Sequence, residues 1–94
     1  MQIEPITVNV KRVETTEAVG GNGFEKRDLI VTTEEQHTQT LAIQFTQGKC
    51  PELDNYKPGD KVKIWLDLRG REYTKNDKTT VFNTIQGWKI EKVV

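Results

Sequence analysis

The sequence has one cysteine, one histidine and no long apolar run, and each scarcity excludes a class of protein. The lone Cys50 cannot form a disulfide within the chain, which is typical of proteins from a reducing compartment. No apolar run approaches the roughly 20 residues that a membrane-spanning helix needs. Residues 1–5 lack the basic and apolar regions of a signal peptide. The sequence therefore predicts a cytoplasmic protein with no membrane partner.

Residues suited to catalysis or metal binding are equally scarce. Cys50 has no second cysteine for a zinc site or a redox pair, and His37 lies in a polar stretch typical of an exposed turn. The sequence contains no nucleophile elbow, P-loop or dinucleotide-binding fingerprint. The glycine-rich segment 20–23 joins two expected strands and does not open a helix, unlike a phosphate-binding loop. We therefore expect no enzyme, no cofactor and no metal site.

Length and charge limit the remaining possibilities. The 94 residues are enough for one domain with one modest core, so we expect a single domain over residues 1–94. The formal net charge is zero, which argues against a binder of duplex DNA. The charge is unevenly distributed, however. Residues 1–56 carry five Lys/Arg against nine Asp/Glu, whereas residues 57–94 carry nine against five.

Most of the chain alternates between apolar and polar residues, the period-2 pattern of half-buried strands. The clearest stretch is 61–92, which we interpret as two long strands joined by a loop over 71–78. The alternation slips at Lys11–Arg12 and again at Gln86–Gly87, and such slips predict β-bulges. Between the third and fourth strands, Gly48–Tyr56 breaks the rhythm, and Pro51 suits the first turn of a short helix. Lys57–Asp60 then has the Pro-Gly chemistry of a type II turn.

Five strands with bends in the first and fifth, and one short helix before the fourth, are typical of an all-β, five-stranded OB-fold barrel. The strands are expected at about residues 6–13, 24–33, 40–46, 61–71 and 81–90. An SH3-like barrel would not normally have a helix between its third and fourth strands, and a sandwich would need more strands. The alternation predicts a core made of Val8, Val10, Leu29, Val31, Leu41, Ile43, Phe45, Val62, Ile64, Leu66, Leu68, Trp88 and Ile90.

Aromatic residues interleave with cations on the outward register of the fourth strand and in the loop after it. Trp65 lies among Lys and Arg residues on a face that is otherwise polar. Rings that stack on bases and cations that follow phosphates are what a sequence-tolerant single-strand binder needs. The candidate nucleic-acid-binding residues are Phe24, Lys26, Arg27, Trp65, Arg69, Arg71, Tyr73, Lys75, Lys78 and Phe82.

Each candidate also has a structural interpretation. Trp65 could pack beneath the helix or in a subunit interface, and Phe24 could cover one end of the barrel. Any single cation could belong to an ordinary solvated face, and Glu72 and Asp77 would weaken the local positive potential.

Several runs of the sequence resemble a compact bacterial branch of the single-stranded-DNA-binding-protein-like OB-fold family. They are the runs at residues 24–36, 57–60, 68–73 and 87–92, so the resemblance covers roughly residues 6–92. It implies the OB fold and single-strand binding. The sequence departs from that branch at Val81–Phe82, where an aromatic pair is usual.

Two functions from different classes follow. The first is binding of single-stranded nucleic acid by aromatic stacking and phosphate contacts, with DNA as the first expectation and RNA as the alternative ligand. The alternative is a protein-interaction or assembly module that uses the same face for another chain. An outward Trp and Phe on so small a domain also predict a homodimer or a higher homo-oligomer.

Overall fold

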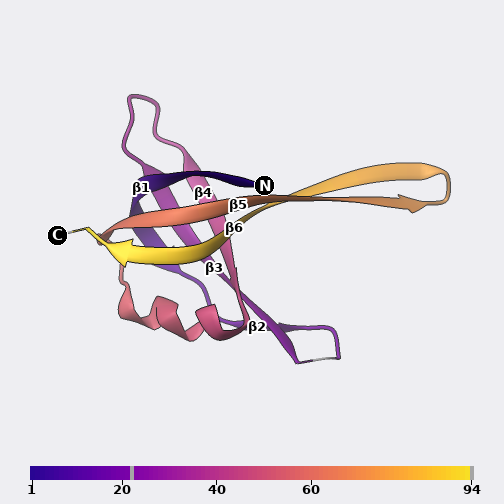
Figure 1. The fold of residues 1–94 in the computed structure, drawn as a ribbon, viewed down its shortest axis with the longest axis horizontal. Helices are drawn as coiled ribbons and strands as arrows, with labels where there is room; N and C mark the ends of the chain where they lie inside the picture. Colours follow the sequence, from indigo (N-terminus) through magenta and orange to yellow (C-terminus); the bar gives the residue numbers. More distant parts are fainter. Residues whose placement is uncertain (22, 94) are drawn as a thin grey trace.

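The computed structural model describes residues 1–21 and 23–93, and within these ranges the chain is all-β with two short helices (Figure 1). The elements in chain order are β1 (Gln2–Val13), β2 (Glu17–Val19), β3 (Phe24–Thr33), β4 (Thr40–Thr46), the 3-10 helices η1 (Gln47–Lys49) and η2 (Pro51–Asn55), β5 (Lys61–Lys75) and β6 (Lys78–Lys92). The five expected strands are confirmed. The short β2, which the sequence did not indicate, pairs with the beginning of β3.

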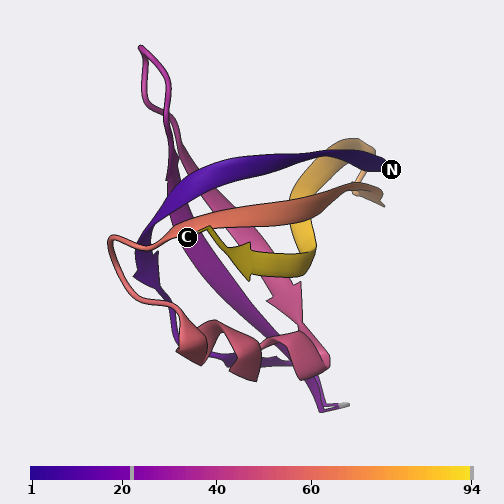
Figure 2. The same ribbon diagram turned by 60° about the vertical axis from the view of Figure 1, so that its left-hand side comes forward.

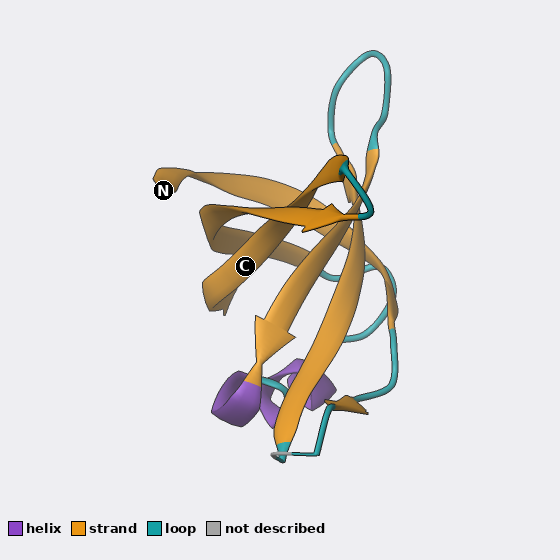
Figure 3. Ribbon diagram, turned by 90° about the vertical axis from the view of Figure 1, so that its right-hand side faces the viewer, coloured by secondary structure: helices purple, strands orange, loops and turns teal. Residues whose placement is uncertain are grey.

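The strands pair in a ring. The sheet order is β1-β5-β6-β4-β3-β2, and an additional pairing joins β1 to β3. Every pairing is antiparallel except that of β4 with β6, which is parallel and consists of the single pair Gln44 and Gln86. Figures 2 and 3 show the two helices at one end of this ring, with the connection between β3 and β4 at the other end.

Two bulges bend the strands where the hydrophobic alternation slips. In β1, Val10 pairs with Val31 and Arg12 pairs with Ile30, so Lys11 is the extra residue. In β6 the register skips Trp88, one residue beyond the predicted position. An extra residue turns the following side chains to the other face, which allows each strand to follow the curved sheet.

The core lies inside the ring and largely matches the predicted list. The confirmed buried residues are Val8, Val10, Leu29, Val31, Ile43, Phe45, Val62, Ile64 and Leu66. Leu41 and Ile90 are partly buried against them, and Leu53 of η2 is fully buried with them.

Two predicted core residues are wrong. Leu68 is 37% exposed and Trp88 is 40% exposed. Leu68 keeps the inward register of β5, but β1 begins beside it, with the Leu68 amide donating to the Met1 carbonyl at 2.6 Å. β1 therefore does not cover the part of β5 that follows Leu68. Trp88 is the extra residue of the β6 bulge and therefore leaves the alternation that would have placed it inside.

The turn before β5 is confirmed. The Asp60 amide donates to the Lys57 carbonyl at 3.1 Å, and Gly59 has φ +94°, as the third residue of a type II turn requires. The predicted helix is also present, but as two 3-10 segments, with Pro51 in the first turn of η2.

The prediction of a loop over residues 71–78 is wrong. β5 continues to Lys75, β6 begins at Lys78, and the connection between them is the pair Asn76–Asp77. Both residues have positive φ, 52° and 62°, which is the geometry of the type I′ turn that suits the twist of a tight hairpin. The paired strands therefore extend beyond the ring as a two-stranded ribbon (Figure 1). We call residues 69–84 the ribbon.

Candidate nucleic-acid interface

The ribbon has two faces of different character. Residues paired directly across an antiparallel ladder project to the same side, and the ladder pairs Arg71 with Phe82 and Tyr73 with Thr80. That side carries four cations, two aromatic rings and no carboxylate, and the structure describes all of its residues. We call it the cationic face, and its members are Arg69, Arg71, Tyr73, Lys75, Lys78, Thr80, Phe82 and Thr84. The opposite face carries Glu72 and Val81.

Shallow hollows follow one another along the cationic face and form a groove. The middle hollow is lined by Arg71, Tyr73 and Phe82. Tyr73 also lines a hollow at the turn end of the ribbon. Arg71 and Phe82 also line one at its foot, which reaches Gln44 of β4. Consecutive hollows share residues, so the groove runs from the ribbon turn to the outer surface of the ring.

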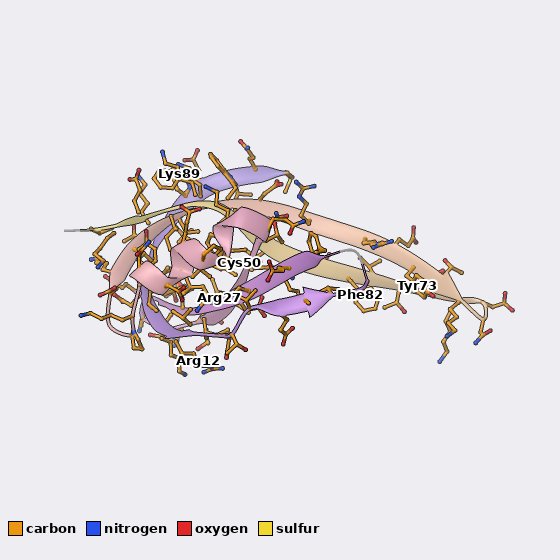
Figure 4. All side chains as sticks on the ribbon, turned by 90° about the horizontal axis from the view of Figure 1, so that it is seen from below. Arg12, Arg27, Cys50, Tyr73, Phe82 and Lys89 are labelled. Carbon is orange, nitrogen blue, oxygen red and sulfur yellow. The ribbon has the colours of Figure 1, made fainter. Side chains whose placement is uncertain are left out.

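The two rings of this groove are open to solvent. Tyr73 is 53% exposed and Phe82 is 59% exposed, and Figure 4 shows both on the ribbon, away from the ring of strands. Aromatic side chains usually bury most of their surface, and exposed apolar side chains that cluster, unlike single ones, mark an interaction site. Both are therefore available to stack on a planar ligand.

Ion pairs divide the cations of the groove into two sets. The Nε of Arg69 lies 2.7 Å from Oδ2 of Asp67, whose Oδ1 accepts a hydrogen bond from the N-terminal amine, also at 2.7 Å. That hydrogen bond, with the charge of Arg69, holds the pKa of Asp67 below its usual value. Within the described residues, no ion pair involves Arg71, Lys75 or Lys78. These three cations remain available to an anionic ligand.

Trp65 lies in a separate cluster. It is half-buried, and the ammonium groups of Lys63 and Lys89 lie 5.1 and 4.6 Å from its ring centroid, within range of a cation–π interaction. In Figure 4, Lys89 lies on the other side of the β5–β6 strand pair from Phe82. Trp65 therefore does not join Tyr73 and Phe82 in one groove.

Phe24 and Lys26 lie on the β2–β3 arm. Phe24 is 39% exposed and pairs with Val19 near the tip of the arm, so it does not cover the end of the ring. Lys26 pairs with Glu17 and lines a hollow together with the carboxylates of Glu14 and Asp28. These carboxylates lower the positive potential around Lys26. Asn22, in the glycine-rich connection of this arm, lies outside the described residues.

Arg27 of β3 joins three parts of the chain through hydrogen bonds and an ion pair. Its register places it on the inward face of β3, and its side chain is 13% exposed. The guanidinium donates to the carbonyls of Glu14 at 2.7 Å and Cys50 at 3.0 Å, and it pairs with Asp54 at 2.8 Å. Its Nε and Nη1 are thus engaged by the segment after β1 and by the helical segment, so Arg27 is poorly placed for the phosphate contact that was expected from the sequence.

Within the described part of the chain, no group of three or more His, Cys, Asp or Glu residues could hold a metal ion. Cys50 is buried, and loss of hydration followed by the charge of Glu25 raises the pKa of its thiol, which makes it less reactive. Among the described residues, no helix has the length and apolar character needed to cross a bilayer.

A family assignment follows from comparison with known families. Residues 5–91 match the family described as "Domain of unknown function (DUF3127)". The chain belongs to this family. No curated protein sequence matches this DUF3127 chain. A crystal structure of a small single-stranded DNA-binding protein from Streptomyces coelicolor matches it with a TM-score of 0.63 and 14% identity. The match covers 100% of this chain and 94% of that chain, so the two share a fold.

Sequence reasoning missed part of the groove of this DUF3127 domain. Gln44, Gln86 and Thr84 line its inner end, but they come from β4 and β6, two strands that only the ring of strands brings together. The cationic face could have been identified from the sequence if Asn76–Asp77 had been taken as a type I′ turn. That turn fixes the pairing of the two strands and thus the residues that share each face.

Proposed function

We propose that this DUF3127 domain binds single-stranded nucleic acid, DNA in the first place, along the cationic face of the ribbon. The observation that carries the proposal is the segregation of groups on the ribbon. Two exposed rings and four cations share one face that has no carboxylate, and Glu72 lies on the other. We interpret the ring of strands as an OB-fold barrel, a fold that often binds oligonucleotides through its strand face and loops.

The comparisons support this proposal through the fold. The similar structure from Streptomyces coelicolor is that of a single-stranded DNA-binding protein. In this chain the ribbon corresponds to the connection between the last two long strands, one of the regions with which OB folds hold oligonucleotides.

The proposed mode of binding assigns different parts of the nucleotide to different residues. Tyr73 and Phe82 stack on bases, which is tolerant of sequence because every base has a π face. Lys75 and Lys78, at the turn end of the ribbon, contact phosphates as mobile point charges. The strand then follows the groove toward Gln44 and the outer surface of the ring.

Salt should weaken binding to a moderate degree. If Lys75 and Lys78 each neutralise one phosphate, the slope of log K against log salt is about −1.4. Affinity should then fall about sevenfold between 50 and 200 mM salt. With a net charge of zero, we expect modest affinity even at low salt.

A pair of neighbouring variants tests the stacking face. Phe82→Ala removes an exposed ring from the cationic face, whereas Val81→Ala removes a side chain of similar exposure, 60% against 59%, from the opposite face. We expect Phe82→Ala to weaken binding of fluorescently labelled oligo(dT) roughly 5- to 150-fold, because stacking on one ring is worth about 1–3 kcal/mol per base. Val81→Ala should leave binding within about twofold of the parent protein.

Charge reversal tests the phosphate contacts. Lys75→Glu with Lys78→Glu should weaken binding at low salt and flatten the salt slope. Lys11→Glu with Lys57→Glu is the matched control, because it changes the net charge equally at two exposed residues, one in the β1 bulge and one in the turn before β5, at the end of β5 opposite to the ribbon. Failure of the parent protein to retain any oligonucleotide at low ionic strength would refute the proposal and leave the protein-interaction module as the better interpretation.

A further inference from the structure

We infer that Arg71 reads the edge of the stacked base and makes the domain prefer guanine over adenine. The inference rests on the proposed function, because it names the base that the same groove selects. Its starting point is the middle hollow, whose lining consists of Tyr73, Phe82 and the side chain of Arg71.

The register places Arg71 next to both rings. Arg71 lies directly across the ladder from Phe82, and Tyr73 is two residues further along β5 on the same face. Directly opposed side chains begin about 4.5–5.5 Å apart at their Cβ atoms. A base stacked on either ring therefore has an edge within reach of the Arg71 side chain, whereas Lys75 and Lys78 lie further along the ribbon.

The two arginines of the cationic face differ in their partners. Arg69 is held by Asp67 at 2.7 Å. Arg71 is exposed, and within residues 1–21 and 23–93 it forms no ion pair. Its guanidinium has five N–H donors and no acceptor, so it selects a base edge that presents acceptors.

Guanine presents such an edge. Its N7 and O6 are adjacent acceptors that match the fork of an arginine, and this is the commonest specific arginine contact to a base. Adenine has the same ring system, and so the same stacking area, but it presents an acceptor beside the N6 amino donor. The two purines therefore differ at the edge that faces Arg71 and hardly at all in what they offer the rings.

The experiment compares short labelled DNA strands in which every third base is varied within a thymine background, so that any binding register includes the variable base. The variable base is guanine, adenine, hypoxanthine or 7-deazaguanine. Hypoxanthine keeps O6 and N7, and 7-deazaguanine lacks N7. We expect guanine and hypoxanthine to bind at least about fivefold more tightly than adenine, with 7-deazaguanine losing most of the preference.

The matched variant is Arg71→Lys, which keeps the charge and removes the fork. We expect it to bind the adenine strand within about threefold of the parent protein and to lose the preference for guanine. Equal binding of guanine and adenine strands by the parent protein, or a preference that survives Arg71→Lys or the loss of N7, would overturn the inference and leave the proposed function intact. Loss of all binding at low salt would overturn both. The base analogues act on the unaltered protein, so the test does not depend on the variant folding.

Discussion

Gly87 is the position where one added methyl group should be most costly. A Cβ built on this buried residue of β6 would lie 2.7 and 2.9 Å from Cε1 and Cε2 of Phe45 and closer still to Cζ. Distances below 3.0 Å are not tolerated, so either the ring or the strand must move. Phe45 has no exposed surface and is the largest side chain in the core, so it has little room to give way.

Overpacking of this kind typically costs 1–3 kcal/mol of unfolding free energy. For a domain of this size, each kcal/mol lowers Tm by about 4–8 °C. We therefore expect Gly87→Ala to lower Tm by roughly 10 °C, and to lower the urea midpoint without changing the m-value. Thermal unfolding followed by circular dichroism, together with urea titration, measures both quantities.

Two further variants separate this clash from a general effect of glycine replacement. A Cβ at Gly48 meets nothing within 4 Å and its φ is not positive, so Gly48→Ala should be neutral or slightly stabilising. Phe45→Leu frees space beside Gly87. The free energy of unfolding lost by the double variant should therefore be smaller than the sum of the losses of the two single variants. A parent-like Tm for Gly87→Ala, or strict additivity in the double variant, would refute the packing argument.

Three other predictions follow from the described contacts. The pKa of Asp60 is lowered, chiefly because its carboxylate accepts the Lys57 amide at 3.0 Å, so its stabilisation is present above about pH 3.9 and is lost as pH falls through the lower folded value. Asp60→Asn should therefore destabilise the protein at pH 7, and the difference in urea midpoint should shrink toward pH 2. Trp65→Ala should weaken oligo(dT) binding less than Phe82→Ala does, and an equal or larger loss in the same titration would place Trp65 on the nucleic-acid path. Exposed Leu68 and Val81 lie on the non-cationic register of β5–β6, so we expect a dimer by light scattering at micromolar concentration, and a monomer mass would contradict this.

The residues that sequence reasoning placed wrongly share a cause. Leu68 continues a perfect alternation, and alternation reports which face a side chain takes but not where its covering strand ends. Trp88 was assigned from the alternation after the slip, although the slip itself places it outside the ladder. The positive charge of Arg27 suggested a ligand contact. The sequence could not show that this charge is already engaged, because the three acceptors lie 13 or more residues away along the chain.

Local patterns were sufficient for much of the architecture. Period-2 alternation depends only on the pleat of a strand, so it identified the five long strands and the inward register of most of the core. Gly59 and Pro51 act through backbone geometry that extends over a few residues, so the turn and the short helix could also be predicted.

Tertiary structure decided how the surface is divided. The sequence by itself determined that rings and cations alternate along residues 61–82, but not that β5 and β6 would twist far enough to place Lys89, beside Trp65, on one side and Phe82 on the other. Only the ring of strands brings Gln44 to the foot of the ribbon, because β4 and β6 are joined by a single pairing between residues far apart in sequence. Side-chain alternation is a local property of one strand, whereas a groove depends on the twist and pairing of several strands.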